Sequence, residues 1–207
     1  MIKENFKSFS AKDLCSKSCM QIKMFDLHPE LRPVPNVNVN NGVNYQHQIA
    51  STMEDLIGEE MRGTFAKEGI LINFSNDIVC KDKIYEIKSV TREAEDWYFK
   101  SSILQCAVYK SLLLKSNKKL VTSKFFVELG NPYIETNVNE NVSYYLKFGD
   151  DLYIINVNNP DKIVEFVYNK ANASLDWDKA REFDNNYKRK EYETLKDYFN
   201  FEKINMA

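Results

Sequence analysis

The chain has 207 residues, of which 43% are hydrophobic and 28% are charged, a composition typical of a globular protein that excludes disorder throughout. Its 28 lysines and arginines nearly balance its 30 aspartates and glutamates, so an anionic partner has to be bound by a local cluster of positive charge. No run approaches about 18 consecutive apolar residues, and the first residues lack the long apolar segment of a secretory signal. We therefore expect a single domain over residues 1–207, in the cytoplasm and without membrane contact.

The four cysteines, at positions 15, 19, 80 and 106, contain no Cys-x-x-Cys pair, and only His28 and His47 could supplement them. This spacing argues against a zinc ribbon. In a chain without an export signal, we expect reduced and mostly buried thiols.

The first quarter of the chain has an irregular pattern. Residues 8–24 predict a short helix capped at Ser10, and residues 36–44 are typical of a polar connection. Apolar residues then recur at spacings of three and four, which predicts one helix over 44–61 with a single buried stripe. His47 falls at the margin of that stripe, where it is either a ligand or an ordinary boundary histidine. The stripe consists of Ile49, Met53, Leu56, Ile57 and Met61.

The next segment has the composition of β-strands. Runs over 70–74, 77–80 and 84–90, separated by polar breaks, predict a meander. A turn at Lys81-Asp82 would set Asp77 opposite Glu86. The two-residue period of a strand places Glu86 and Lys88 on the same face. Two acids and one lysine are therefore expected to converge.

A second helix is predicted over residues 97–114, where Gln105 and Tyr109 lie four apart on one face. Between Trp97 and Val127 there are six lysines, including Lys100 and Lys110, and no acidic residue. This segment is either a solvated surface with a chance bias or a surface for an anionic ligand.

The pattern of the segment after residue 123 predicts secondary structure and no functional site. It predicts strands over 124–129, 143–148 and 152–157, a hairpin at Gly149-Asp150, a helix that begins at Pro160, and a long charged helix over 177–201. No internal repeat and no second domain is visible. The fold class predicted from these elements is α/β, with a central β-sheet flanked by helices.

Asp77 and Glu86, the two acids expected to converge, are the candidates for a functional site. Two carboxylates on adjacent strands can supply the oxygen ligands that a hard divalent cation prefers. A lysine two residues after Glu86 can orient an attacking water and offset charge that builds on a phosphate. Acids and a lysine on neighbouring strands also occur as cross-strand salt bridges, so this pattern alone leaves a purely structural role open.

The ordered set resembles the RecB-like branch of the PD-(D/E)xK nuclease superfamily. That branch is marked by a helix-borne His, an Asp on one strand, Glu/Asp-x-Lys on the next and Gln-x-x-x-Tyr on the following helix, which match His47, Asp77, Glu86-Ile87-Lys88 and Gln105-x-x-x-Tyr109. Residues 9–19 and 41–47 are similar to the Ser-rich N-terminal segment of these nucleases and to their approach to the histidine helix. The resemblance covers residues 42–114.

This resemblance implies a restriction-endonuclease-like core with a mixed sheet over 44–130, preceded by an N-terminal segment (1–43) and followed by additional strands and helices (131–207). It implies that Mg²⁺ or Mn²⁺ is bound by His47, Asp77, Glu86 and the main-chain carbonyl of Ile87, with Lys88 as the catalytic lysine. Glu60 is the candidate for a further acidic ligand. The iron–sulfur cluster of some relatives needs three cysteines near the C-terminus, and no cysteine follows Cys106, so we expect no cluster.

The function implied is a metal-dependent deoxyribonuclease, an exonuclease or a single-strand endonuclease, acting in DNA repair, recombination, replication or the processing of mobile-element or viral genomes. Gln105 and Tyr109 would position DNA, and Lys100 and Lys110 would contact its backbone. The alternative is a non-catalytic nucleic-acid-binding or protein-interaction module with the same fold. A structural protein with an ion-pair network would leave Gln105 and Tyr109 unexplained.

Overall fold

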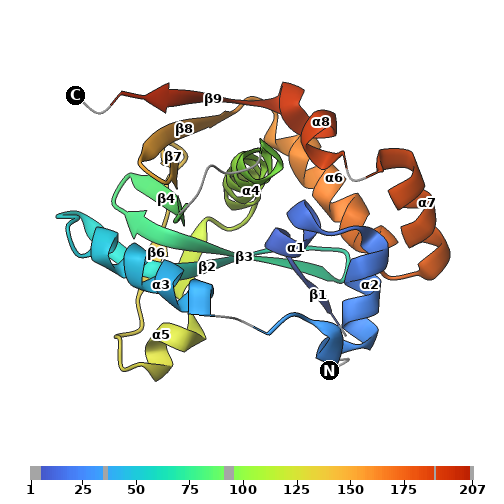
Figure 1. Cartoon of the computed structure of the whole chain (residues 1–207), viewed down its shortest axis with the longest axis horizontal. Helices are drawn as coiled ribbons and strands as arrows, with labels where there is room; N and C mark the ends of the chain where they lie inside the picture. The colour runs from blue at the N-terminus through green and yellow to red at the C-terminus, as the bar shows by residue number, and fades with distance from the viewer. Residues whose placement is uncertain (1–5, 35–36, 91–95, 189, 206–207) are drawn as a thin grey trace.

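A computed structural model of the chain describes residues 6–34, 37–90, 96–188 and 190–205. Within these residues it shows a mixed sheet of nine strands flanked by helices (Figure 1), which confirms the predicted α/β class. The order along the sheet is β6-β5-β2-β3-β4-β7-β8-β9, and β1 pairs with β3 outside this path. The strands are β1 (Lys7–Ser10), β2 (Leu56–Lys67), β3 (Ile70–Cys80), β4 (Lys83–Lys88), β5 (Lys119–Thr122), β6 (Glu135–Asn137), β7 (Ser143–Phe148), β8 (Asp151–Val157) and β9 (Phe199–Ile204).

Helices cover both faces of the sheet. The larger core packs α4 and α6 with α1 against one face, and α3 packs through Ala50 against Ile78, Cys80 and Ile87 on the other. None of the helices in the described ranges is both long and apolar enough to cross a membrane. The helices are α1 (Ala11–Ser16), α2 (Cys19–Leu27), α3 (Val37–Ala50), α4 (Asp96–Lys115), α5 (Lys124–Glu128), α6 (Pro160–Ala173), α7 (Trp177–Tyr187) and α8 (Glu191–Leu195), with 3₁₀ turns at Pro29–Leu31 and Lys196–Tyr198.

Several predicted elements are confirmed. Helix α4 covers the predicted 97–114, Pro160 is the first residue of α6, and β7 and β8 form the predicted hairpin. Gly149 at that hairpin has φ 57°, a conformation that glycine adopts without a Cβ penalty. The turn at Lys81-Asp82 joins β3 to β4 as expected, and the predicted strands 70–74 and 77–80 are one continuous strand.

The predicted helix over 44–61 is wrong at both ends. Helix α3 begins at Val37, so the segment 36–44 is helical from that residue rather than a connection, and it ends at Ala50. Leu56 and Met61 belong instead to β2, which pairs with β3 across a tight turn at Gly69. Residue 36 itself lies outside the described residues.

Three further elements differ from the prediction. The segment 8–24 forms β1 and two short helices, because Ser18 starts α2 with a capping box of its own. Residues 124–128 are helical rather than extended, and Ser123 caps them. The predicted helix over 177–201 ends at Tyr187, where Lys188 turns left-handed at φ 45°, and the chain returns to the sheet as β9.

The four cysteines are buried and free of disulfides, as predicted. Burial raises the pKa of Cys15 to about 12 and that of Cys19 to about 11. These thiols are protonated at neutral pH and serve as small core residues.

Candidate functional site

Three carboxylates lie side by side on three adjacent strands. The pairs Glu59–Ile78 and Met61–Asn76 place Glu60 of β2 opposite Asp77 of β3. In the same way, the pair Ile78–Tyr85 places Asp77 opposite Glu86 of β4, as the sequence predicted. Glu60, Asp77 and Glu86 line one cavity of about 260 Å³.

Lys88 and Gln105 complete the floor of this carboxylate cavity. Lys88 Nζ lies 2.5 Å from Glu86 Oε1, so the two side chains share a face of β4 as predicted. Gln105 of α4 donates from Nε2 to the same Glu86 oxygen at 2.7 Å and accepts from Lys88 Nζ at 3.3 Å. Glu86 is only 2% exposed, and its Oε2 is buried with no hydrogen-bond partner among the described residues. One oxygen of Glu86 is therefore saturated and the other is available to a ligand.

Asp77 is bound on two sides by the protein. Its Oδ2 accepts from the Ile87 amide at 2.7 Å, and its main-chain oxygen accepts from Gln46 Nε2 at 2.9 Å. Loss of solvent and the neighbouring charge of Glu86 raise the pKa of Asp77 well above its usual range, although Lys88 acts in the opposite direction.

The pKa values of Glu60 and Lys88, at the two ends of the site, are also shifted. Burial raises the pKa of Glu60, against the hydrogen bond that Ser75 Oγ donates to its Oε2 at 3.0 Å. Burial lowers the pKa of Lys88, but the charges of Glu86 and Asp77 outweigh this effect and the net shift is upward. Lys88 is therefore protonated at neutral pH, and three acids line the same cavity, an arrangement that a bound cation would stabilise.

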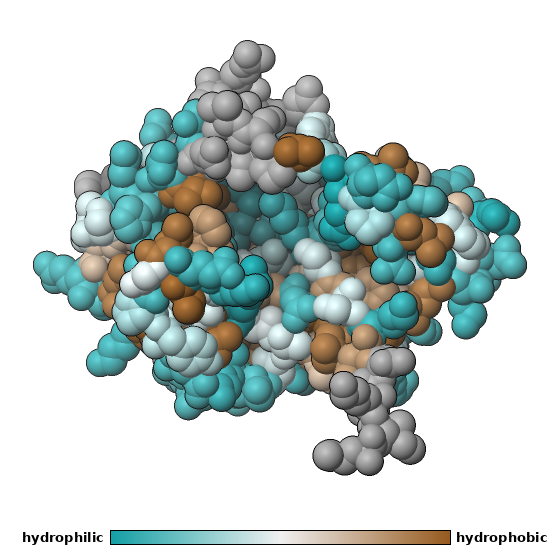
Figure 2. Space-filling view, turned by 90° about the horizontal axis from the view of Figure 1, so that it is seen from below, coloured by the Kyte–Doolittle hydropathy of each residue, from teal (hydrophilic) through white to brown (hydrophobic). Residues whose placement is uncertain are grey.

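The structure does not bring His47 into the carboxylate cavity. His47 Nδ1 lies 2.9 Å from Glu59 Oε1, and its exposed side chain lines a second cavity of about 570 Å³ with Phe125 of α5 and Leu129, which follows that helix. Successive residues on a helix diverge by about 100°, so Gln46 faces Asp77 and the next residue cannot. Figure 2 shows hydrophobic residues gathered on one side of a hollow on the face seen from below, the side on which α5 lies.

Of the other predicted residues, two line the carboxylate cavity and two do not. Ile87 and Tyr109 line the carboxylate cavity, and Tyr109 is buried beside Phe74, with ring centroids 5.7 Å apart. Lys100 pairs with Asp96 at 2.7 Å, and Lys110 donates to the main-chain oxygen of Ile155 at 3.4 Å. Neither lysine lines the carboxylate cavity.

Five residues that line the cavity were not predicted as site residues: the polar Lys12, Gln46 and Ser75, together with Gly42 and Val43. Gln46 is next to His47, so a one-residue rotation of the helix in the prediction would have identified it. Ser75 is two residues before Asp77 on the same strand. Lys12 belongs to a distant helix, and no local pattern in the sequence connects it to the acids.

In the part of the chain that the structure describes, no three His, Cys, Asp or Glu side chains form a preassembled metal centre. Asp77 and Glu86 each direct one oxygen to a protein donor. The donor set nevertheless suits a hard cation, because it consists of carboxylate oxygens and includes the buried, unpartnered Glu86 Oε2.

Comparisons of the chain with protein-family models, with curated proteins and with solved structures found no match. The residues of the carboxylate cavity are therefore the basis for assigning a function.

Proposed function

We propose that this chain is a Mg²⁺- or Mn²⁺-dependent deoxyribonuclease with a PD-(D/E)xK core, which hydrolyses phosphodiester bonds in DNA repair, recombination, replication or the processing of mobile-element or viral genomes. One observation carries the proposal. Glu60, Asp77 and Glu86 reach a single cavity from three adjacent strands, and Lys88 lies in the same cavity. Oxygen ligands for a cation beside a buried ammonium can together promote hydrolysis of a phosphodiester.

The residues that would hold the ion are Asp77 and Glu86, with Glu60 and the main-chain carbonyl of Ile87. Glu86 Oε2 supports this assignment, because a buried carboxylate oxygen without a partner is costly unless a ligand occupies it. A bound ion would polarise the phosphate and lower the pKa of the attacking water. His47 is left out of this set because it pairs with Glu59 elsewhere.

The role proposed for Lys88 follows from its charge and its neighbours. The raised pKa keeps the ammonium protonated, so Lys88 can donate to an anionic phosphate oxygen or orient a water beside it. Gln105 holds Glu86 and Lys88 in fixed positions through its amide. Fixed donors and acceptors need no reorganisation when charge develops on the phosphate.

An ion pair that serves only stability explains the carboxylate cavity less well than a metal site does. The free energy needed to remove two charges from water exceeds the free energy of their attraction, unless further hydrogen bonds satisfy the remaining donors and acceptors of both groups. Here the carboxyl groups of Glu60 and Asp77 both have raised pKa values, and Glu86 Oε2 has no hydrogen-bond partner among the residues that the structure describes. Acids kept together at a cost to stability are typical of a functional site.

The test incubates end-labelled single- and double-stranded DNA with the wild type, Lys88→Ala and Lys179→Ala, in Mg²⁺, Mn²⁺ or EDTA. Lys179 is an exposed lysine of α7 that controls for the loss of one charge. Cleavage that needs metal and is absent only from Lys88→Ala supports the proposal. DNA binding without cleavage by the wild type overturns it in favour of a non-catalytic binding module.

A further inference from the structure

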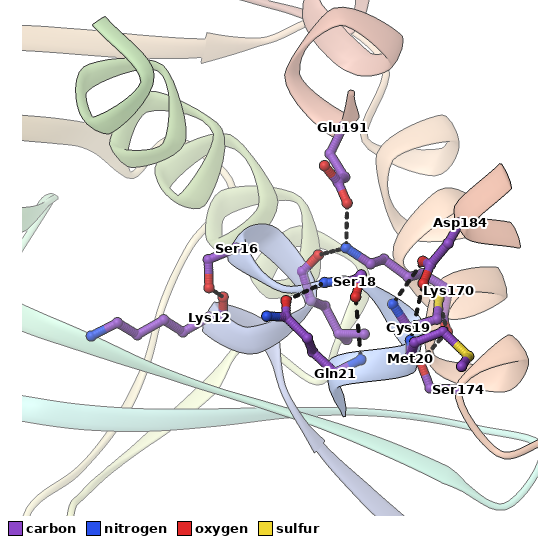
Figure 3. Close-up of polar contacts among 11 residues, drawn as sticks. Lys12, Ser16, Ser18, Cys19, Met20, Gln21, Lys170, Ser174, Asp184 and Glu191 are labelled. Atoms are coloured by element: carbon purple, nitrogen blue, oxygen red, sulfur yellow. Dashed lines mark hydrogen bonds and ion pairs between the residues drawn. The ribbon is translucent and has the colours of Figure 1, made fainter. Parts of the chain in front are cut away.

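Lys12 of α1 lines the carboxylate cavity although it lies far from the other cavity residues in the sequence. Helix α1 buries Ala11, Leu14 and Cys15 in the main core, which leaves Lys12 on its exposed side. No residue in the described ranges forms an ion pair or hydrogen bond with the Lys12 ammonium. In Figure 3 its side chain extends away from the contacts around Lys170, and only its main-chain oxygen is engaged, by Ser16.

The backbone of Lys12 is held by buried contacts. Lys170 of α6, which is fully buried, donates to the main-chain oxygen of Leu14 at 2.7 Å and pairs with Glu191 of α8 at 2.5 Å (Figure 3). Asp184 of α7 accepts from the first two amides of α2, at 2.8 and 3.0 Å. The position of α1 beside the cavity is therefore fixed by the fold, whereas the Lys12 ammonium has no partner among the described residues.

The acid next to Lys12 does not neutralise it. Asp13 accepts from Lys17 at 2.5 Å and from Arg32 at 3.3 Å, so both of its oxygens serve other cations. The second cation of the cavity, Lys88, is bound to Glu86 and Gln105. An anion that enters from solvent thus meets one ammonium with no competing partner in the described structure.

We infer that Lys12 contacts a backbone phosphate of the DNA strand at the mouth of the carboxylate cavity, a role that rests on the proposed function. It takes the role that was predicted for Lys100 and Lys110, which make their contacts with other parts of the molecule. The three carboxylates repel a polyanion, so a substrate phosphate can approach them only beside a compensating charge. Lys12 supplies that charge from outside the sheet and contributes to substrate binding rather than to the chemical step.

The experiment measures binding and cleavage separately. A fluorescently labelled single-stranded oligonucleotide is titrated in EDTA over a range of KCl concentrations with the wild type, Lys12→Ala, Lys12→Arg and Lys179→Ala. Loss of one phosphate contact should weaken binding by Lys12→Ala roughly tenfold. It should also lower the slope of log affinity against log salt by about 0.7. We expect Lys12→Arg and Lys179→Ala to stay close to the wild type, and KM to rise in Lys12→Ala with kcat little changed.

The outcomes separate this inference from the proposed reaction. If the wild type cleaves DNA and Lys12→Ala matches Lys179→Ala in both salt slope and KM, the role of Lys12 is overturned and the nuclease stands. If the wild type binds DNA without cleaving it and Lys12→Ala still lowers the salt slope, the reaction fails and the phosphate contact is supported. Absence of DNA binding by the wild type at low salt overturns both. Circular dichroism of Lys12→Ala checks that the variant is folded.

Discussion

Gln105 Nε2 donates to Glu86 Oε1 at 2.7 Å while Gln105 Oε1 accepts from Lys88 Nζ at 3.3 Å, so one amide on α4 orients both members of the ion pair on β4. Few other side chains offer a donor and an acceptor at this spacing. The buried position of Gln105, 7% exposed, leaves water little room to replace it.

Replacing Gln105 with Met should therefore reduce activity without unfolding the protein. Loss of a group that orients metal ligands costs roughly 10–100-fold in activity or metal affinity. We expect a decrease of that size in kcat/KM, and a higher Mn²⁺ concentration for half-saturation in both the cleavage assay and direct calorimetry. Gln48, an exposed residue of α3, provides the control Gln48→Ala. Equal metal affinity for both variants would remove Gln105 from the site.

Lys88→Met should separate stability from activity. The variant leaves Glu86 buried without its counter-charge, at a cost of about 3 kcal/mol in the free energy of unfolding. The double variant Glu86→Gln/Lys88→Met removes both charges and should recover most of that loss, while cleavage stays absent from both. Urea denaturation measures the first effect and the nuclease assay the second. A double variant that cleaves DNA at the wild-type rate would exclude both residues from the chemistry.

The part of the site on β3, β4 and α4 was predictable because local periodicity determines it. A two-residue period puts Glu86 and Lys88 on one face, a short turn sets the register with Asp77, and a helical period presents Gln105. Glu60 was also identified, but on a helix. The spacing of Leu56, Ile57 and Met61 fits both a helical and a strand period, and the choice depends on packing across the sheet. Gly63 of β2 shows how close this packing is, because a Cβ at that position would lie 2.3 Å from the ring of Phe74.

The remaining site residues depend on contacts that the sequence does not encode locally. The amphipathic stripe predicts a helix around His47 but not its rotation, and a rotation of about 100° exchanges Gln46 for His47 at Asp77. Lys12 reaches the cavity through long-range contacts of α1, which packs into the main core and accepts a hydrogen bond from Lys170 at the main chain of Leu14. Long-range docking of this kind leaves no periodic signal.

Asp77→Asn should stabilise the metal-free protein at neutral pH. Burial and the charge of Glu86 raise the pKa of Asp77 above its unfolded value, so the folded state binds the proton more tightly. The stability that this provides is present at low pH and is lost as pH rises from the ordinary value of about 4 towards the raised one. Asparagine keeps an acceptor for the Ile87 amide and does not titrate.

Thermal unfolding in EDTA over a series of pH values measures this effect. The Tm of Asp77→Asn should exceed that of the wild type at neutral pH, by roughly 2–4 °C for each kcal/mol gained, and the difference should shrink on acidification. Asp26→Asn, on the exposed side of α2, should show no such trend. A difference that grows as the pH falls would mean that the pKa of Asp77 is lowered, not raised.

Glu191→Ala should destabilise the protein much more than Glu193→Ala, two residues further along α8. Glu191 pairs with the fully buried Lys170, and its removal leaves an ammonium whose remaining partner in the described part of the chain is the Leu14 carbonyl, at a cost of about 3–5 kcal/mol. Glu193 pairs with the exposed Lys196, a contact that water and salt screen, so its loss should change stability little. Urea denaturation compares the two variants.

Because Lys170 anchors α1, hydrogen exchange in Glu191→Ala should also increase first at α1. Lys12 should then lose its effect on the salt dependence of DNA binding. Equal stability of the two variants would show that the Lys170–Glu191 pair does not fix α1 beside the cavity.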